Sequence, residues 1–173
     1  PKGGIKPHNK FAITSNRSEV LFIDYIMNHL KPKGRAGIIV PEGVVFQSGV
    51  AYKSLRKNLL NNGLYAVVSL PGGVFQPYSG VKTSILLIDN EVAREKNEIA
   101  FIKVSADGFD LGSTKRVIEK NDLPAALEII TAYKAGSKNE HEIVSYVSKK
   151  DKEASGDFNL TGDKYKSDDS ERV

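Results

Sequence analysis

The sequence predicts an α/β protein with an open sheet and helices on its faces. In the first half of the chain, segments with helical periodicity alternate with short runs rich in Val and Ile. Two of these runs, Ala66–Leu70 and Ile85–Ile88, have the continuous apolar character of strands buried on both faces. No helical segment separates them, although a parallel crossover usually carries a helix. The second strand is therefore expected to lie antiparallel beside the first.

The first helix is expected over Ser18–Leu30. Asn16 and Glu19 have the spacing of a capping box at its start. Apolar residues then recur at helical spacing and form a stripe that would face the core. The stripe consists of Val20, Phe22, Ile23, Ile26, Met27 and Leu30.

A strand, a loop and a second helix are expected next. Ala36–Val40 is predicted to be a short buried strand that Pro41 ends. Gly43–Gly49 is expected to be a loop. Val50–Asn62 places Leu and Tyr on one face and Lys and Arg on the other, and Gly63 follows as its C′ residue.

The second half is predicted to add two strands and a helix between polar stretches. In chain order these segments are a connector at Glu91–Glu98, a strand at Ile99–Val104, a loop at Asp107–Lys120, a helix from Asp122 to Lys134 capped by Asn121, a turn at Gly136–Glu140 and a strand at Glu142–Ser148. Few apolar residues follow Lys149, so an extended or partly disordered tail is expected.

Composition excludes several classes of protein. The 173 residues, 40% of them hydrophobic, are enough for one domain of ordinary size. The absence of Cys excludes disulfides and thiolate metal sites and fits a reducing compartment. No apolar run approaches the length of a membrane span, and no signal peptide is visible. The chain begins at Pro1 without Met, which indicates a fragment or a processed chain.

The net charge of +4 is unevenly distributed. Residues 1–90 hold 11 Lys and Arg against 4 Asp and Glu, whereas residues 91–173 hold 14 against 17. The basic half either contacts phosphate groups or forms an ordinary solvated surface, and charge alone does not decide between them.

Most common catalytic signatures are absent. There is no GxGxxG, Walker A or GxSxG motif. His8, His29 and His141 lack the spacing of metal ligands, so surface or packing roles are expected for them and no metal site is predicted. Asp24 is expected at an exposed helix position. Glu42 either caps a loop or lines a ligand crevice.

The connection Pro71–Thr83 is the best candidate for a functional site. It is longer than the roughly two to five residues of a hairpin turn, and it leaves the carboxyl end of a strand, where open α/β sheets bind ligands. Phe75 and Tyr78 lie among Gly and Pro residues, and Lys82 near the end of the loop is placed to meet a phosphate. The rings either stack on a flat ligand such as a nucleobase or plug the edge of the core.

Three segments of the chain resemble one family of enzymes. They are RSEVLFIDYIMNHLKPKGRAGIIVPEGVVFQSGVAYKSLRK, VVSLPGGVFQPYSGVKTSILLID and FNLTGDKYK. They are similar to N6-adenine DNA methyltransferases of the modification (M) subunit kind in type I restriction–modification systems, and to related single-chain enzymes. The resemblance is strong over residues 1–90 and weak over 91–165.

The resemblance implies the C-terminal half of a Rossmann-like, S-adenosylmethionine-dependent methyltransferase sheet. Ala36–Val40, Tyr65–Leu70 and Thr83–Asp89 would be strands five to seven, the last one antiparallel, with flanking helices. It also implies that the chain is divided into three parts. Residues 1–90 would be the C-terminal half of the catalytic domain, 91–148 an additional strand–helix–strand region, and 149–173 a polar tail or linker.

The resemblance also implies site residues. Such enzymes take the target adenine out of the duplex, and a tetrapeptide of the form (Asp/Asn/Ser)-Pro-Pro-(Tyr/Phe) binds its amino group. A second aromatic side chain, between the sixth and seventh strands, covers the other side of the base and matches Phe75. By the same resemblance Tyr78 would contact the flipped adenine, and the DNA backbone would meet Lys82, Lys2, Lys6 and Lys10.

The tetrapeptide and the glycine-rich motif that binds S-adenosylmethionine are absent from the chain. Because PKGGIKPHNKF resembles the sequence just after the tetrapeptide, the catalytic motif and most of the cofactor site are expected upstream of Pro1. The chain alone is then expected to be inactive. Its half-sheet would expose an edge and an apolar face, so self-association or marginal stability is expected unless residues 91–173 cover that face.

The resemblance implies double-stranded DNA and a specificity subunit or target-recognition domain as partners, with a restriction subunit as a further candidate. It places the protein in the prokaryotic cytoplasm and away from membranes. Two alternatives remain open at this point. One is a non-catalytic module that docks a specificity subunit or target-recognition domain, and the other is an α/β enzyme that methylates RNA or protein.

Overall fold

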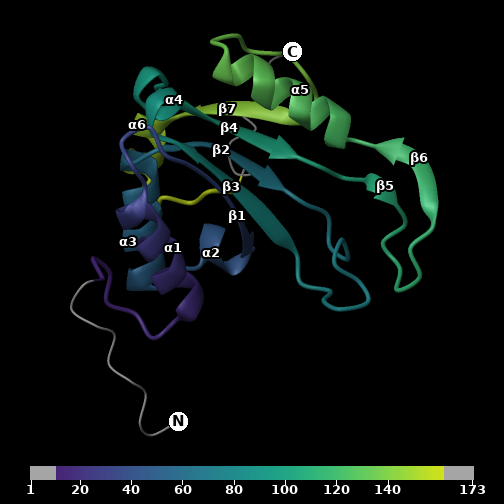
Figure 1. Cartoon of the computed structure of the whole chain (residues 1–173), viewed down its shortest axis with the longest axis horizontal. Helices are drawn as coiled ribbons and strands as arrows, with labels where there is room; N and C mark the ends of the chain where they lie inside the picture. Colours follow the sequence, from purple (N-terminus) through teal and green to yellow (C-terminus); the bar gives the residue numbers. More distant parts are fainter. Residues whose placement is uncertain (1–10, 162–173) are drawn as a thin grey trace, which may run out of the picture.

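The chain folds around a five-stranded mixed sheet, as a computed structural model of residues 11–161 shows (Figure 1). The strand order is β1-β3-β2-β4-β7. Helices α1 and α3 cover one face of the sheet, and α5 lies on the opposite face (Figure 1). The predicted α/β class is therefore confirmed.

The elements of the first half match the predicted ones closely. They are α1 (Ser18–His29), β1 (Arg35–Pro41), α2 (Gly43–Phe46), α3 (Val50–Asn61), β2 (Leu64–Ser69) and β3 (Thr83–Asp89). Gly63 follows α3 with φ +100°, which confirms its prediction as the C′ residue. The loop expected at Gly43–Gly49 instead begins with the short helix α2. The predicted capping box is wrong, because the N-cap of α1 is Arg17 and no side chain caps it.

Strand β3 lies between β1 and β2 and is antiparallel to both. This confirms the prediction that the second apolar run is antiparallel beside the first. Because β2 also pairs parallel with β4, the carboxyl ends of β1, β2 and β4 lie at the same edge of the sheet. We call this edge the carboxyl edge.

The second half departs further from expectation. Its elements are α4 (Asn90–Glu95), β4 (Glu98–Lys103), β5 (Asp107–Phe109), β6 (Val117–Asn121), α5 (Leu123–Lys134), β7 (Val144–Ser148) and α6 (Lys149–Ala154). The predicted strands and helix are confirmed, but the predicted cap of the helix is wrong, because the N-cap of α5 is Asp122 and not Asn121. The connector after β3 is a helix that Asp89 caps through the N–H groups of Glu91 and Val92. The expected loop at Asp107–Lys120 contains the β5–β6 hairpin. All five residues of β6 are exposed, so no apolar alternation revealed it.

Strand β1 forms one edge of the sheet. The prediction of a buried strand is wrong, because only Val40 is buried along it and Ile39 is 55% exposed. On the other side, β4 and β7 extend the sheet beyond β2, and α5 packs over them. Residues beyond 90 therefore cover part of the face that the sequence predicted to be open.

A buried arginine joins α2, α3 and the C-terminal segment. The guanidinium of Arg56 donates to three carbonyls, of Val44 at 3.1 Å, Phe158 at 3.1 Å and Asp157 at 2.8 Å. The N–H of Leu160, which is itself buried, donates to the carbonyl of Val45 at 2.8 Å. The expectation of an extended or partly disordered tail is therefore wrong for residues 149–161. Burial lowers the pKa of Arg56, while the charge of Asp157 opposes that shift.

We predict that Arg56→Met destabilises the chain by about 2–4 kcal/mol, because it leaves buried carbonyls without a donor. Urea unfolding followed by circular dichroism measures this change. The control is Lys57→Met, which removes an exposed charge from the adjacent position of the same helix. Equal midpoints for the two variants would contradict the anchoring role of Arg56.

Candidate functional site

The loop between β2 and β3 lies at the carboxyl edge of the sheet (Figure 1). At its base the N–H of Leu70 donates to the carbonyl of Thr83 at 3.0 Å. Within it, the carbonyl of Gly73 accepts from the N–H of Gln76, and the carbonyl of Phe75 accepts from the N–H groups of Tyr78 and Ser79, all within 3.0 Å. The aromatic residues are therefore held in tight hydrogen-bonded turns.

Both rings of the loop are accessible. Phe75 is 37% exposed and Tyr78 is 95% exposed. The nearby Val74, instead, packs against the core cluster formed with α5. The loop is thus attached to the core by Val74, whereas the ring of Phe75 stays partly exposed.

Lys82 forms an ion pair with Glu42 at the carboxyl edge. Its Nζ lies 2.7 Å from Oε1 of Glu42, and the backbone N–H of Glu42 donates to the carbonyl of Lys82 at 3.0 Å. Glu42 does not cap α2 with its side chain. The pair therefore joins the end of β1 to the end of the loop and balances the lysine charge. Lys2, Lys6 and Lys10 lie outside the described residues.

A small cavity of about 50 Å³ opens beside this pair, at the carboxyl edge of the sheet. Its lining includes Glu42, Lys82, Ser69, Ser84, Lys103 and Leu160. Polar groups from several strand ends therefore lie beside apolar side chains, among them Val67, Phe101 and Leu160. Sequence reasoning did not select Ser69, Ser84 or Lys103, because no motif connects them.

Residues 5–172 match the family model described as N-6 DNA Methylase. The chain belongs to the N-6 DNA methylase family. The resemblance inferred from the sequence is therefore confirmed.

Two curated relatives carry related names. The chain is 39% identical over 85 residues to the type I restriction enzyme EcoEI methylase subunit of Escherichia coli, covering 48% of the chain and 17% of that protein. It is 33% identical over 86 residues to the EcoKI methylase subunit of E. coli strain K12, covering 49% of the chain and 16% of that protein. The chain thus spans about a sixth of the length of these relatives.

Solved structures show the same fold. One, from work on complex assembly and conformational transition of the type I R-M system, aligns with TM-score 0.70 and 29% identity over 93% of the chain and 35% of its own. A methyltransferase subunit of a type I restriction-modification system from Streptococcus thermophilus aligns with TM-score 0.66 and 23% identity, over 87% of the chain and 31% of its own.

Asp24 is fully buried, so its expected exposure is wrong. Its Oδ2 accepts from the N–H of Ala12 at 2.9 Å, which attaches the segment before α1 to the helix. Its Oδ1 has no hydrogen-bond partner among residues 11–161. The burial arises because residues before the helix, including the buried Ile13, fold back against it.

The two described histidines have local structural roles in this family member. His29 stacks on Tyr25 with ring centroids 3.9 Å apart, and Nδ1 of His141 accepts from the N–H of Ile143. His8 is not among the described residues.

Within residues 11–161, no group of three or more His, Asp or Glu side chains is arranged to hold a metal ion. None of the helices in that range has the length and hydropathy of a membrane span.

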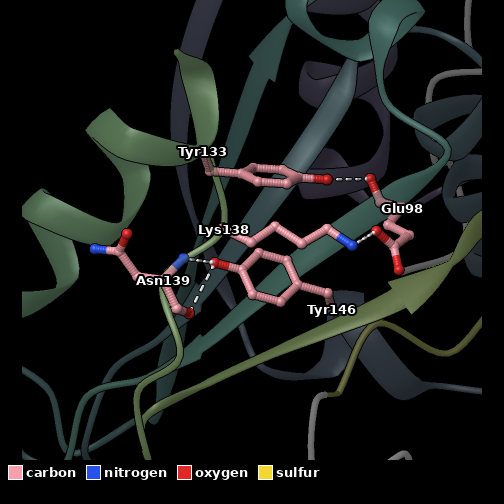
Figure 2. A network of polar contacts seen from close by, with 5 residues as sticks. All are labelled: Glu98, Tyr133, Lys138, Asn139 and Tyr146. Atoms are coloured by element: carbon pink, nitrogen blue, oxygen red, sulfur yellow. Dashed lines mark hydrogen bonds and ion pairs between the residues drawn. The ribbon is translucent and has the colours of Figure 1, made fainter. Parts of the chain in front are cut away.

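A polar network at the opposite face attaches α5 to the sheet (Figure 2). The phenol of Tyr133 donates to the carbonyl of Glu98 at 2.8 Å, and Lys138 pairs with the carboxylate of Glu98. The hydroxyl of Tyr146 accepts a hydrogen bond from the backbone N–H of Asn139 and donates one to its carbonyl. Each of these contacts joins parts of the fold to one another, so we assign the network to stability rather than chemistry. Burial of its phenol raises the pKa of Tyr133.

We predict that stability falls as pH rises above about 10, where a Tyr in the unfolded chain ionises. The raised pKa keeps Tyr133 protonated in the folded state, so only the unfolded state loses that proton, at about 1.4 kcal/mol per pH unit. Urea unfolding between neutral and alkaline pH measures the slope. Tyr133→Phe should reduce this slope. An unchanged slope in Tyr133→Phe would contradict this assignment.

Proposed function

We propose that the chain is part of a site-specific DNA adenine-N6 methyltransferase of a restriction–modification system. The observation that carries this proposal is the accessible Phe75 on a hydrogen-bonded loop at the carboxyl edge of the sheet. Membership of the N-6 DNA methylase family and the names of its relatives support it.

Phe75 is proposed to stack on the adenine after the base leaves the duplex. An enzyme must extrude the base because its amino group cannot be approached productively within the stack. A partly exposed ring on a restrained loop offers a flat apolar surface at little entropic cost on binding. Tyr78 is proposed to contact the same base or its flanking nucleotides.

Lys82 is proposed to bind a phosphate of the DNA backbone in place of the carboxylate of Glu42. Its ion pair with Glu42 is partly exposed, with the two side chains 38% and 29% accessible, and such pairs contribute little to stability. A phosphate can therefore replace the carboxylate at modest cost. Lys2, Lys6 and Lys10 remain predicted backbone contacts, and the basic charge of residues 1–90 supports them.

S-adenosylmethionine is the proposed methyl donor of the complete enzyme. The cavity at the carboxyl edge is too small to hold it, because its volume is only about 50 Å³, whereas sites for small ligands are about 300–1,000 Å³. We propose that most of its site comes from parts of the methyltransferase outside these 173 residues. The coverage of 17% of the EcoEI relative supports this division.

A second candidate is a docking module for a specificity subunit or target-recognition domain. Exposed apolar side chains favour it, notably Val117 on β6 at 80% and Leu127 on α5 at 66%.

A restriction subunit is a further proposed partner, and the prokaryotic cytoplasm is the proposed compartment. The division at residues 90 and 148 stays a prediction, although β4 pairs directly with β2 across the first boundary.

The proposed role of Phe75 predicts that Phe75→Ala lowers methylation of duplex DNA by about tenfold in a complete methyltransferase that contains this segment, since stacking contributes about 1–3 kcal/mol per base. Transfer of a labelled methyl group to DNA measures it. The matched control is Phe22→Ala, which removes an exposed ring from α1. If Phe75→Ala retains full turnover, the stacking role is wrong.

The 173-residue chain alone is predicted to transfer no methyl group to duplex DNA. The same labelling assay, with the complete enzyme as positive control, tests this. Measurable incorporation by the chain alone would show that it holds a complete active site.

If Val117→Ser weakens binding to the specificity subunit while Phe75→Ala leaves methylation intact, the docking alternative is favoured.

A further inference from the structure

We propose that the β5–β6 hairpin positions the Phe75 loop, with Lys115 and Gly73 as the residues that connect them. The role assigned to Lys115 rests on the proposed function, because the loop must hold an aromatic ring against an extruded base. The hairpin itself belongs to a separate two-stranded sheet and lies beside the loop at the carboxyl edge (Figure 1).

Lys115 spans the two elements. Its Nζ donates to the carbonyl of Gly73 at 2.8 Å and to the carbonyl of Asp110 at 3.2 Å. The ammonium group therefore bridges a backbone oxygen of the loop and one of the hairpin turn. The side chain is partly buried, so water competes less for these bonds than it would at an open surface.

Gly73 permits the close approach of the two backbones. Its φ is +86°, a conformation that side chains disfavour, and a Cβ added to it would lie 2.7 Å from the carbonyl oxygen of Leu111. Any larger residue must push the loop away from the hairpin. A Cβ added to the adjacent Gly72 would meet no atom within 4 Å, so the requirement is specific to Gly73.

The contact reaches Phe75 through one turn of backbone. The carbonyl of Gly73 that Lys115 binds also accepts the N–H of Gln76, and Phe75 lies inside that turn. The hairpin in turn is attached to α5 and β4, because Oδ2 of Asp122 accepts from the N–H groups of Ser105 and Ala106. Lys115 thus connects the aromatic turn to the β5–β6 hairpin, which lies outside the strands β2 and β3 that the loop joins.

The first test is amide hydrogen exchange in the 173-residue chain. Lys115→Met should raise exchange at the amides of Gln76, Tyr78 and Ser79 by about fivefold, the equivalent of one net hydrogen bond. Lys120→Met, which removes the same charge from an exposed position of β6, should not change it. Gly73→Ala should raise exchange at the same amides as Lys115→Met does, and Gly72→Ala should leave their exchange unchanged.

The second test is methylation by a complete methyltransferase that contains this segment. Lys115→Met should lower the rate on a duplex with a paired target adenine by about fivefold. The loss should be smaller when the target adenine is mismatched, because a mismatched base costs less to extrude. A variant that merely unfolds part of the enzyme would lose activity equally on both substrates, so the ratio of the two rates reports positioning.

Two outcomes separate this inference from the proposed function. If Phe75→Ala lowers methylation but Lys115→Met changes neither loop exchange nor the ratio of rates, the hairpin does not position the loop and this inference is wrong. If Lys115→Met speeds loop exchange while Phe75→Ala leaves methylation intact, the contact exists but the stacking function fails. Faster exchange across the whole sheet in Lys115→Met would show a general loss of stability and would also overturn the inference.

Discussion

The insertion of β3 between β1 and β2 determines the arrangement of the site. Because β3 is antiparallel to both neighbours, the chain must leave β2 and return to β3 at the same edge of the sheet. That edge is also where β1 and β4 end. A parallel strand would have required a crossover helix over one face. The antiparallel insertion instead places the β2–β3 loop at the edge where open α/β sheets bind ligands.

Two groups of polar contacts hold the surroundings of this loop in place. The guanidinium of Arg56 binds carbonyls about a hundred residues away in sequence, at separations of 101 and 102, and so fixes the C-terminal segment against α2 and α3. At the other face, Tyr133 and Lys138 bind Glu98 and hold α5 on β4 (Figure 2). Burying such groups is favourable only when their hydrogen bonds are satisfied. Arg56 and Tyr133 meet that condition by binding backbone oxygens.

The loop is therefore restrained at three places, while its rings stay accessible. Its ends continue β2 and β3, Val74 packs into the core, and the ion pair of Lys82 with Glu42 joins it to β1. An aromatic ring on such a loop has little freedom to lose on binding, which favours the stacking role that we propose for Phe75. The hairpin contact through Lys115 adds a restraint from outside the central strands.

The sequence by itself determined α1, α3 and α5, the five strands of the main sheet and the antiparallel direction of β3, because periodicity and continuous apolar runs record which faces are buried. It also placed Phe75 on a glycine-rich loop at a strand end. Only the tertiary structure decided that Val74 rather than Phe75 packs into the core, that Glu42 pairs with Lys82, and that Asp24 is buried. It alone revealed the β5–β6 hairpin, whose second strand buries no residue. These features depend on contacts between residues distant in sequence, and no local pattern of hydrophobicity records such contacts.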